Sequence, residues 1–506
     1  MSPLVFLILL LILTSIFCYL SPASARRTAF MGSALQLILF LSLLLIYLFR
    51  VDDGAEVFYG WKWELLPELG VVMGLGMDGF SAIMLLLATL VMFAAVWATP
   101  APERSVGFYY GNLFLIAAGV VGAFASTDLL FFYLFHELAL IPTFLMIGIW
   151  GTGDKHRVAW KVTIYLALAS FVLLIGILGL YINLPEISRT FGMRELVDLA
   201  NSGVLQTPDW VFVMLFLGFG ALVSLFPFHT WAPGAYACAP SSVAMLHAGV
   251  LKKFGLYGLL RVVLPIFPHE MQEYGHVLLI LILGNIFFVG YATMAQRRLD
   301  WMLGYSSVMH MGYIFLGIAS AMVPFAGGGG SYYLNPLSLG GAGILMFAHG
   351  ISIAILFALS GQLRRRTATL EFSELGGMGK TMPAFGLLMG MGTFASIGLP
   401  GFANFSGELL VFFGAFGSGG AQFLNFYQIA TAIAVWGVVV SAIYGLRAYR
   451  WTCFGETPER WVGSNELVDL RGREKFAIWI LVVFSLLVGF WPQGFLKLLI
   501  PALLAQ

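Results

Sequence analysis

The chain has 506 residues, of which 60% are hydrophobic and only 10% are charged. A soluble domain has about 25% charged residues, so this chain lacks the polar side chains that a water-facing surface requires. The composition therefore excludes a soluble globular protein. Three widely separated cysteines, Cys18, Cys238 and Cys453, form no CxxC or Cys/His cluster. This spacing argues against a structural disulfide, a zinc site or an iron–sulfur cluster.

Apolar segments of the length that crosses a bilayer, roughly 20 residues, recur from one end of the chain to the other. They predict an all-α polytopic membrane protein with about 14 transmembrane helices. The predicted spans are 3–20, 30–49, 71–98, 109–126, 128–149, 160–182, 209–236, 241–264, 276–294, 301–322, 339–361, 384–416, 425–446 and 476–499. The first resembles a signal peptide, but no basic residue precedes it and Arg26 and Arg27 follow it. It is interpreted as a retained span.

The charges of the connecting loops predict the orientation. One alternating set is basic and holds Arg26, Arg27, Arg104, Lys155, Arg157, Arg297, Arg298, Arg364, Arg365, Arg366, Lys380, Arg447, Arg450, Arg460, Arg471, Arg473 and Lys475. The other set holds Arg50, Lys62, Arg189 and Arg194 beside acids such as Asp52 and Asp53. The positive-inside rule places the basic loops in the cytoplasm and both termini on the opposite side. The glycine-rich segment 325–333 is expected to be a flexible outer loop.

Two of the predicted spans are interrupted by proline and glycine. Span seven contains LFPFHTWAPG with Pro227 and Pro233, and span twelve contains GLPGFANFSG with Pro400. Broken helices in membranes gather where a cavity or an ion path runs. Breaks five spans apart indicate two inverted five-helix repeats, spans 4–8 (residues 109–264) and spans 9–13 (residues 276–446). Residues 1–108 then form spans 1–3, and residues 447–506 form a cytoplasmic-side loop and span 14. The alternative is that each break is an ordinary packing kink.

Ionisable residues occur in the middle of several predicted spans. With a rise of 1.5 Å per residue, Glu137 and Lys253 lie about 14 Å and 18 Å inside their spans, and His310 and His349 about 14–15 Å inside theirs. Glu408 likewise lies in an apolar stretch of span twelve. A charge at the bilayer centre costs at least about 2.5 kcal/mol, which favours a function in ion or proton transport. Histidine is suited to relay protons near neutral pH, although each histidine here has a purely structural alternative.

Six segments in one order resemble the antiporter-like membrane subunits of respiratory complex I (NADH:quinone oxidoreductase), and among them the M type (NuoM type, chain 4). The segments are FHELALIPTFLMIGIWG (135–151), FPFHTWAPGAY (226–236), LHAGVLKKFGLYGLLR (246–261), DWMLGYSSVMHMGYIFLGI (300–318), FAHGISIAILFALSGQL (347–363) and GLPGFANFSGELLVFFGAF (398–416). The resemblance covers roughly residues 70–500. It implies a proton-translocating subunit that has no redox centre of its own.

The resemblance also implies partners and residue roles. FMN, iron–sulfur clusters and quinone are expected in partner subunits, and L- and N-type antiporter-like subunits are expected beside this chain. The membrane is expected to be the bacterial inner membrane rather than that of an energy-converting organelle. The residues that match the family's proton-transfer positions are Glu137, Lys253, Glu408, His310 and His349, and Lys161 matches a lysine near the cytoplasmic end of span six.

One position departs from the family pattern. The lysine that the family has in span seven falls at Leu222, and Lys252 stands where the family usually has an apolar residue. We hypothesise that Lys252 supplies the missing positive partner of Glu137. The alternatives that remain open are the homologous subunit of a multisubunit Na⁺/H⁺ antiporter and that of a membrane-bound hydrogenase or ferredoxin-linked complex. A stand-alone solute carrier fits less well, because the sequence indicates no polar pocket of substrate size.

Overall fold

The computed structural model describes residues 2–51, 54–323, 334–418, 424–462 and 467–505. The predicted outer loop 325–333 and the acids Asp52 and Asp53 lie outside these ranges. Within them, 10 helices are long and apolar enough to cross a membrane, or 11 if a bent pair near the C-terminus counts as one span. The predicted polytopic helical membrane fold is confirmed, while the count of 14 spans and the repeats stay predictions.

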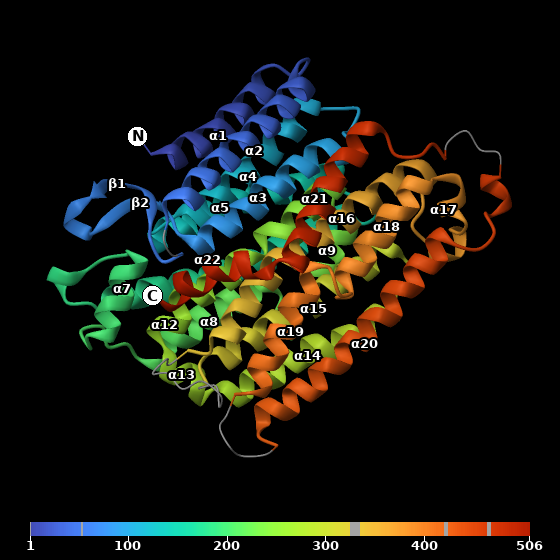
Figure 1. Cartoon of the computed structure of the whole chain (residues 1–506). Helices are drawn as coiled ribbons and strands as arrows, with labels where there is room; N and C mark the ends of the chain where they lie inside the picture. The colour runs from blue at the N-terminus through green and yellow to red at the C-terminus, as the bar shows by residue number, and fades with distance from the viewer. Residues whose placement is uncertain (1, 52–53, 324–333, 419–423, 463–466, 506) are drawn as a thin grey trace.

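The N-terminal part of the chain consists of long helices and one β-hairpin (Figure 1). Its elements are α1 (Pro3–Leu20), α2 (Ala25–Arg50), β1 (Phe58–Leu66), the 3₁₀ turn η1 (Pro67–Leu69), β2 (Val71–Met77), α3 (Gly79–Ala98), α4 (Val106–Ala125), α5 (Leu129–Trp150), α6 (Lys155–Ile182), η2 (Glu186–Ser188) and α7 (Met193–Asn201). Most predicted boundaries differ from these by only a few residues.

The hairpin corrects the predicted span 71–98. Strands β1 and β2 pair antiparallel, from Phe58 opposite Met77 to Leu66 opposite Val71. The apolar strand β2 runs directly into α3, so composition alone merges the two. The helix begins at Gly79 because the Asp78 carboxylate accepts a hydrogen bond from the Ser81 backbone N–H at 3.0 Å, which caps its first turn. The fold is thus mostly helical, as predicted, but it also contains a two-stranded sheet.

The middle of the chain contains the first broken span and a helix with two π-helical turns. The elements are α8 (Asp209–Val223), α9 (Ala232–Cys238), α10 (Ser241–Leu246), the π turn η3 (His247–Leu251), α11 (Lys253–Gly258), the π turn η4 (Leu259–Val263), α12 (Leu264–Ile266) and α13 (Pro268–Glu273). The gap between α8 and α9 holds Pro227, as the sequence predicts. Asn285 closes this gap, because its side chain accepts from Phe226 N–H at 2.7 Å and donates to the Ser224 carbonyl at 3.0 Å.

The C-terminal half repeats the pattern of long helices around a break. It contains α14 (Gly275–Met294), α15 (Leu299–Ala321), α16 (Pro336–Thr367), η5 (Phe372–Glu374), α17 (Met378–Thr381), α18 (Pro383–Ser396), α19 (Ala403–Phe416), α20 (Phe426–Cys453), η6 (Glu459–Trp461), α21 (Gly472–Phe490) and α22 (Pro492–Leu504). The second break, between α18 and α19, holds Pro400 as predicted. The predicted span 476–499 is too long: α21 ends at Phe490, and α22 turns away from it by 78°.

Helices α3 and α16 form the buried centre of the molecule, since every residue of their most apolar windows is buried within the chain. The surrounding long helices expose many large apolar side chains, such as Phe171, Trp436 and Phe476, as expected of lipid-facing surfaces. In Figure 1 the hairpin, α7 and both chain ends lie at one end of the helix bundle, and α17 lies at the other. The basic loop at 362–383 contains α17 and is therefore far from the termini.

Candidate functional site

A connected series of polar side chains crosses the buried centre; we call Lys252, Ser307, His349, His310 and Glu408 the buried row. Lys252, at the end of π turn η3, donates from Nζ to the Ser307 carbonyl at 3.2 Å and lies 3.5 Å from Ser307 Oγ. Ser307 on α15 is bonded in turn to His349 Nε2 on α16 at 3.1 Å. The row thus begins on the segment that the sequence assigns to the first repeat and continues into the second.

The row continues from His349 to Glu408. The rings of His349 and His310 stack with their centroids 5.5 Å apart. His310 Nδ1 lies 3.8 Å from a carboxylate oxygen of Glu408 on α19, and both side chains are almost fully buried. His310 Nε2 also lies 3.2 Å from the Tyr444 hydroxyl, which is bonded to Ser306 at 2.8 Å. The structure therefore brings together Lys252, His310, His349 and Glu408, four of the seven residues that the sequence singled out.

Lys253 lies beside the row and faces a different partner. Its Nζ donates to the Ala248 carbonyl at 2.8 Å, and its side chain is completely buried. In a regular α-helix that carbonyl would accept the backbone N–H of residue 252, whereas in the π turn Lys252 N–H bonds to His247 instead. The π turn thus frees an acceptor for the ammonium of Lys253. A buried ammonium needs such an acceptor, because an unpaired one is costly.

Glu137 on α5 lies apart from the row. Its carboxylate accepts a hydrogen bond from Ser170 on α6 and lies 3.6 Å from His136 Nδ1. About a third of its side chain, 34%, is exposed at the surface of the chain. The structure does not show the hypothesised pair of Lys252 and Glu137: Lys252 is bonded to Ser307, and the described basic side chain next to Glu137 is His136. Leu222 is a buried apolar residue of α8.

Lys161 on α6 contacts the first broken span rather than the buried row. Its Nζ donates to the Thr230 carbonyl at 2.8 Å, between α8 and α9. Asn285 bonds to other backbone groups of the same gap. Lys161 therefore satisfies a backbone carbonyl that the interrupted helix leaves free. Its predicted role in proton transfer stays a prediction.

Sequence reasoning missed three polar residues near the predicted site. His247 is buried in η3, and neither of its ring nitrogens has a hydrogen-bond partner among the described residues. The same holds for both amide atoms of Asn404, one helical turn before Glu408. Tyr444 touches His310 from α20. Their spacing in the sequence gives no signal, because each reaches the site only through packing of distant helices.

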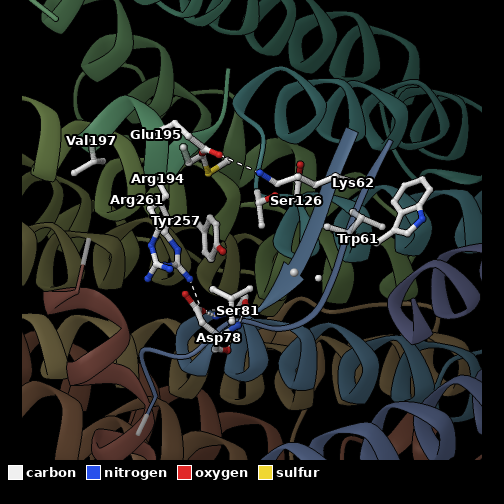
Figure 2. A pocket seen from close by; sticks show the side chains of 16 residues that line it. Trp61, Lys62, Asp78, Ser81, Ser126, Arg194, Glu195, Val197, Tyr257 and Arg261 are labelled. Carbon is white, nitrogen blue, oxygen red and sulfur yellow. Dashed lines mark hydrogen bonds and ion pairs between the residues drawn. The ribbon is translucent and has the colours of Figure 1, made fainter. Parts of the chain in front are cut away.

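A cavity lies beside the hairpin, and Figure 2 shows the side chains that line it. It measures about 420 Å³ and is lined from β1, β2 and α7 as well as by Asp78, Tyr257 and Arg261. Arg261 is bonded to Asp78 at 2.5 Å and lies 5.1 Å from the ring centroid of Tyr257. This buried ion pair joins the start of α3 to η4. The cavity opens at the end of the molecule that carries few basic loops and does not contact the buried row.

Buried ionisable side chains beside two broken spans define a class of membrane protein, the ion-translocating polytopic subunits. The comparison with known proteins is more specific. Residues 126–434 match the family described as NADH:quinone oxidoreductase/Mrp antiporter, TM, and the chain belongs to this family.

Relatives along nearly the whole length agree with that assignment. The chain is 33% identical to NAD(P)H-quinone oxidoreductase chain 4 of Gloeobacter violaceus over 85% of this chain and 79% of that protein. It is 32% identical to F(420)H(2) dehydrogenase subunit M of Methanosarcina mazei, over 89% and 87%. Among solved structures, a chain of respiratory complex I from Thermus thermophilus superimposes with a TM-score of 0.84 at 27% identity, and 99% of each chain is covered.

Proposed function

We propose that this chain is the M-type, proton-translocating membrane subunit of a quinone-reducing complex related to complex I. The observation that carries the proposal is the buried row, in which the Lys252 ammonium lies beside the Ser307 hydroxyl, the hydroxyl is bonded to His349, and His349 stacks on His310, which lies beside Glu408. All of these groups can exchange protons, and a row of them through an apolar interior provides a route for H⁺.

In this proposal the chain carries no redox centre and acts as the translocase part of an enzyme complex. Electron transfer belongs to partner subunits, which hold FMN, iron–sulfur clusters and quinone, and its energy drives proton movement here. L- and N-type antiporter-like subunits flank the chain in a bacterial inner membrane. The M-type relatives belong by name to complexes with different electron donors, NAD(P)H and F₄₂₀H₂, so the donor is a property of the partner subunits.

Glu408 is the proton acceptor at the opposite end of the buried row from Lys252. Replacing it by glutamine keeps the volume but removes the exchangeable charge next to His310. Glu408→Gln in the assembled complex is expected to lower proton translocation per electron at least fivefold. The measurement is the acidification of proteoliposomes or inverted vesicles during quinone reduction. The control is Glu459→Gln, at an exposed position of η6, which should pump like the wild type. Normal pumping by Glu408→Gln would refute the proposal.

Glu137→Gln tests the separate acid on α5. It removes the charge that Ser170 and His136 hold, and we expect sharply reduced pumping with assembly preserved. The measurement is the same vesicle assay, accompanied by quantification of the assembled complex. Unchanged pumping at normal turnover would remove Glu137 from the mechanism and leave the buried row as its core.

A further inference from the structure

A second cavity lies at the end of the molecule that carries the basic loops. It measures about 270 Å³ and is lined by the loop before α4, the end of α5, the α9–α10 junction, the start of α15 and the end of α16. Asp300 and Arg364 form an ion pair in its wall. A water molecule occupies about 30 Å³ in the liquid, so several fit inside. We call this space the vestibule.

Tyr236 forms the inner wall of the vestibule towards Lys252. Its side chain is 2% exposed, and its hydroxyl has no hydrogen-bond partner within the described part of the chain. Such a hydroxyl is costly unless water reaches it. The ring of the same tyrosine lies 5.5 Å from Lys252 Nζ. Tyr236 therefore separates a space that can hold water from the first member of the buried row by the width of one ring.

Among the described residues, no carboxylate is paired with Lys252. Its described contacts are the carbonyl and hydroxyl of Ser307 and the face of Tyr236, and the neighbouring residue is a second buried lysine. A buried cation without a carboxylate partner is destabilising. The fold keeps Lys252 at this cost, between Ser307, which is bonded to His349, and Tyr236, which lines the vestibule.

We propose that Lys252 is a second proton carrier of this chain, which takes its proton from water in the vestibule past Tyr236 and passes it through Ser307 to His349. In the transfer, Lys252 Nζ gives a proton to Ser307 Oγ while the hydroxyl gives its own proton to His349 Nε2, so the serine ends unchanged. Lys253, which is bonded to the Ala248 carbonyl, takes no part in this transfer. The proposal rests on the proton-translocating function proposed above and adds an uptake site and a carrier to it.

Two substitutions of Lys252 distinguish its role as a proton carrier from the effect of its positive charge. Methionine removes both, whereas arginine keeps the positive charge and the hydrogen-bond donors but does not release a proton. We expect Lys252→Met and Lys252→Arg each to lower protons moved per electron at least twofold in the assembled complex. Wild-type pumping by Lys252→Arg would overturn the proposal in favour of a purely electrostatic role. Wild-type pumping by Lys252→Met would overturn it outright.

Ser307→Ala tests the transfer step on a neighbouring helix, in case the lysine variants do not assemble. It removes the hydroxyl between Lys252 and His349 and should also lower pumping at least twofold. The matched control is Ser320→Ala on the same helix, because Ser320 is equally buried but bonds to Leu316 and Ser338 outside the row. Equal effects of the two substitutions would show a packing effect and overturn the assigned transfer.

Access to the vestibule is measured by thiol labelling. Ser241 lines the cavity, so Ser241→Cys in a complex freed of Cys18, Cys238 and Cys453 should react with a membrane-impermeant, positively charged thiol reagent from the basic-loop side. Labelling should lower pumping, whereas labelling of Glu459→Cys on the same side should not. An unreactive Ser241→Cys, or one that is labelled without effect, would overturn the uptake site.

The experiments distinguish a failure of the proposed function from a failure of the proposed role of Lys252. If Glu408→Gln stops pumping while Lys252→Met and labelled Ser241→Cys pump normally, the proposed function stands and the second carrier falls. If Glu408→Gln itself pumps normally, the proton-translocating function falls and the further inference falls with it.

Discussion

The carboxylate of Glu408 lies against the backbone of Gly398 in the second broken span. A Cβ atom built on Gly398 would collide with Glu408 Oε2, and the backbone there has φ of +70°. Both facts favour glycine, because positive φ is strained for residues with a side chain. The glycine thus makes room for the carboxylate at the end of the buried row.

This contact predicts the effect of a single methyl group. Gly398→Ala should displace the Glu408 carboxylate from His310 and lower pumping several-fold, in addition to about 1–2 kcal/mol of backbone strain. The matched control is Gly455→Ala, at φ of +88°, where no atom of the described residues lies within 4 Å of the new Cβ. It carries the strain without the collision. Equal pumping by the two variants would contradict the prediction.

At the scale of elements, a buried acid, Asp128, caps the N-terminus of α5. Asp128 is 2% exposed, and its carboxylate accepts the Phe131 backbone N–H at 3.0 Å. Burial raises the pKa of Asp128 from 3.8 to about 6, against the lowering effect of its backbone hydrogen bonds. The folded chain therefore keeps this proton to a higher pH than the unfolded chain. Its contribution to stability falls as the pH rises from about 4 to about 6 and stays low above that.

Asp128→Asn should remove this pH dependence while preserving the cap. The amide oxygen still accepts the N–H of Phe131, and a neutral side chain carries no penalty for a buried charge. We expect a gain on the order of 1–3 kcal/mol at pH 7.5 and little change at pH 4. Thermal unfolding of the detergent-solubilised protein at both pH values measures it. Asp209→Asn, at the exposed start of α8, should leave the stability almost unchanged at both pH values. A gain for Asp128→Asn at pH 4 alone would contradict the assignment.

At the scale of the whole molecule, one carboxylate joins distant parts of the chain. Glu474, at the start of α21, accepts from Arg365 at 3.1 Å and from Arg366 at 3.3 Å, both at the end of α16. Its side chain is 2% exposed, and that of Arg366 is 6% exposed. Helix α21 also packs against α3. The cluster therefore fastens the C-terminal helices to the two helices at the centre of the fold.

Loss of Glu474 should loosen this attachment. Glu474→Ala leaves the buried guanidinium of Arg366 without its carboxylate partner, and breaking a buried ion pair typically destabilises a protein by about 3–5 kcal/mol. We expect a lower melting temperature and faster proteolysis between α20 and α21, measured by limited digestion of the solubilised protein. Glu374→Ala removes an exposed ion pair with Arg460 and should change little. Comparable losses in the two variants would contradict the cluster's role.

The sequence predicts the long helices and both breaks because their signals are local: apolar length, proline and glycine. It does not predict the hairpin, since β2 is as apolar as the helix that follows. The sequence also does not predict which way the side chain of Lys252 points. A rotation of 100° per residue holds for an α-helix only, and the π turn at 247–251 changes the phase before Lys252 and Lys253. The pairing of Lys252 with Ser307 instead of Glu137 follows from that turn and from helices far apart in the chain.

Ser307 has one hydrogen to offer, and this limits how the buried row works. After a proton has passed from Lys252 to His349, the hydroxyl hydrogen is the one received from the lysine and points back towards it. The next transfer requires the hydroxyl to rotate first. Each passage is therefore followed by a resetting turn of a single C–O bond, during which the row does not conduct. On the proposed route the serine therefore passes one proton at a time, and a rotation of its hydroxyl separates each transfer from the next.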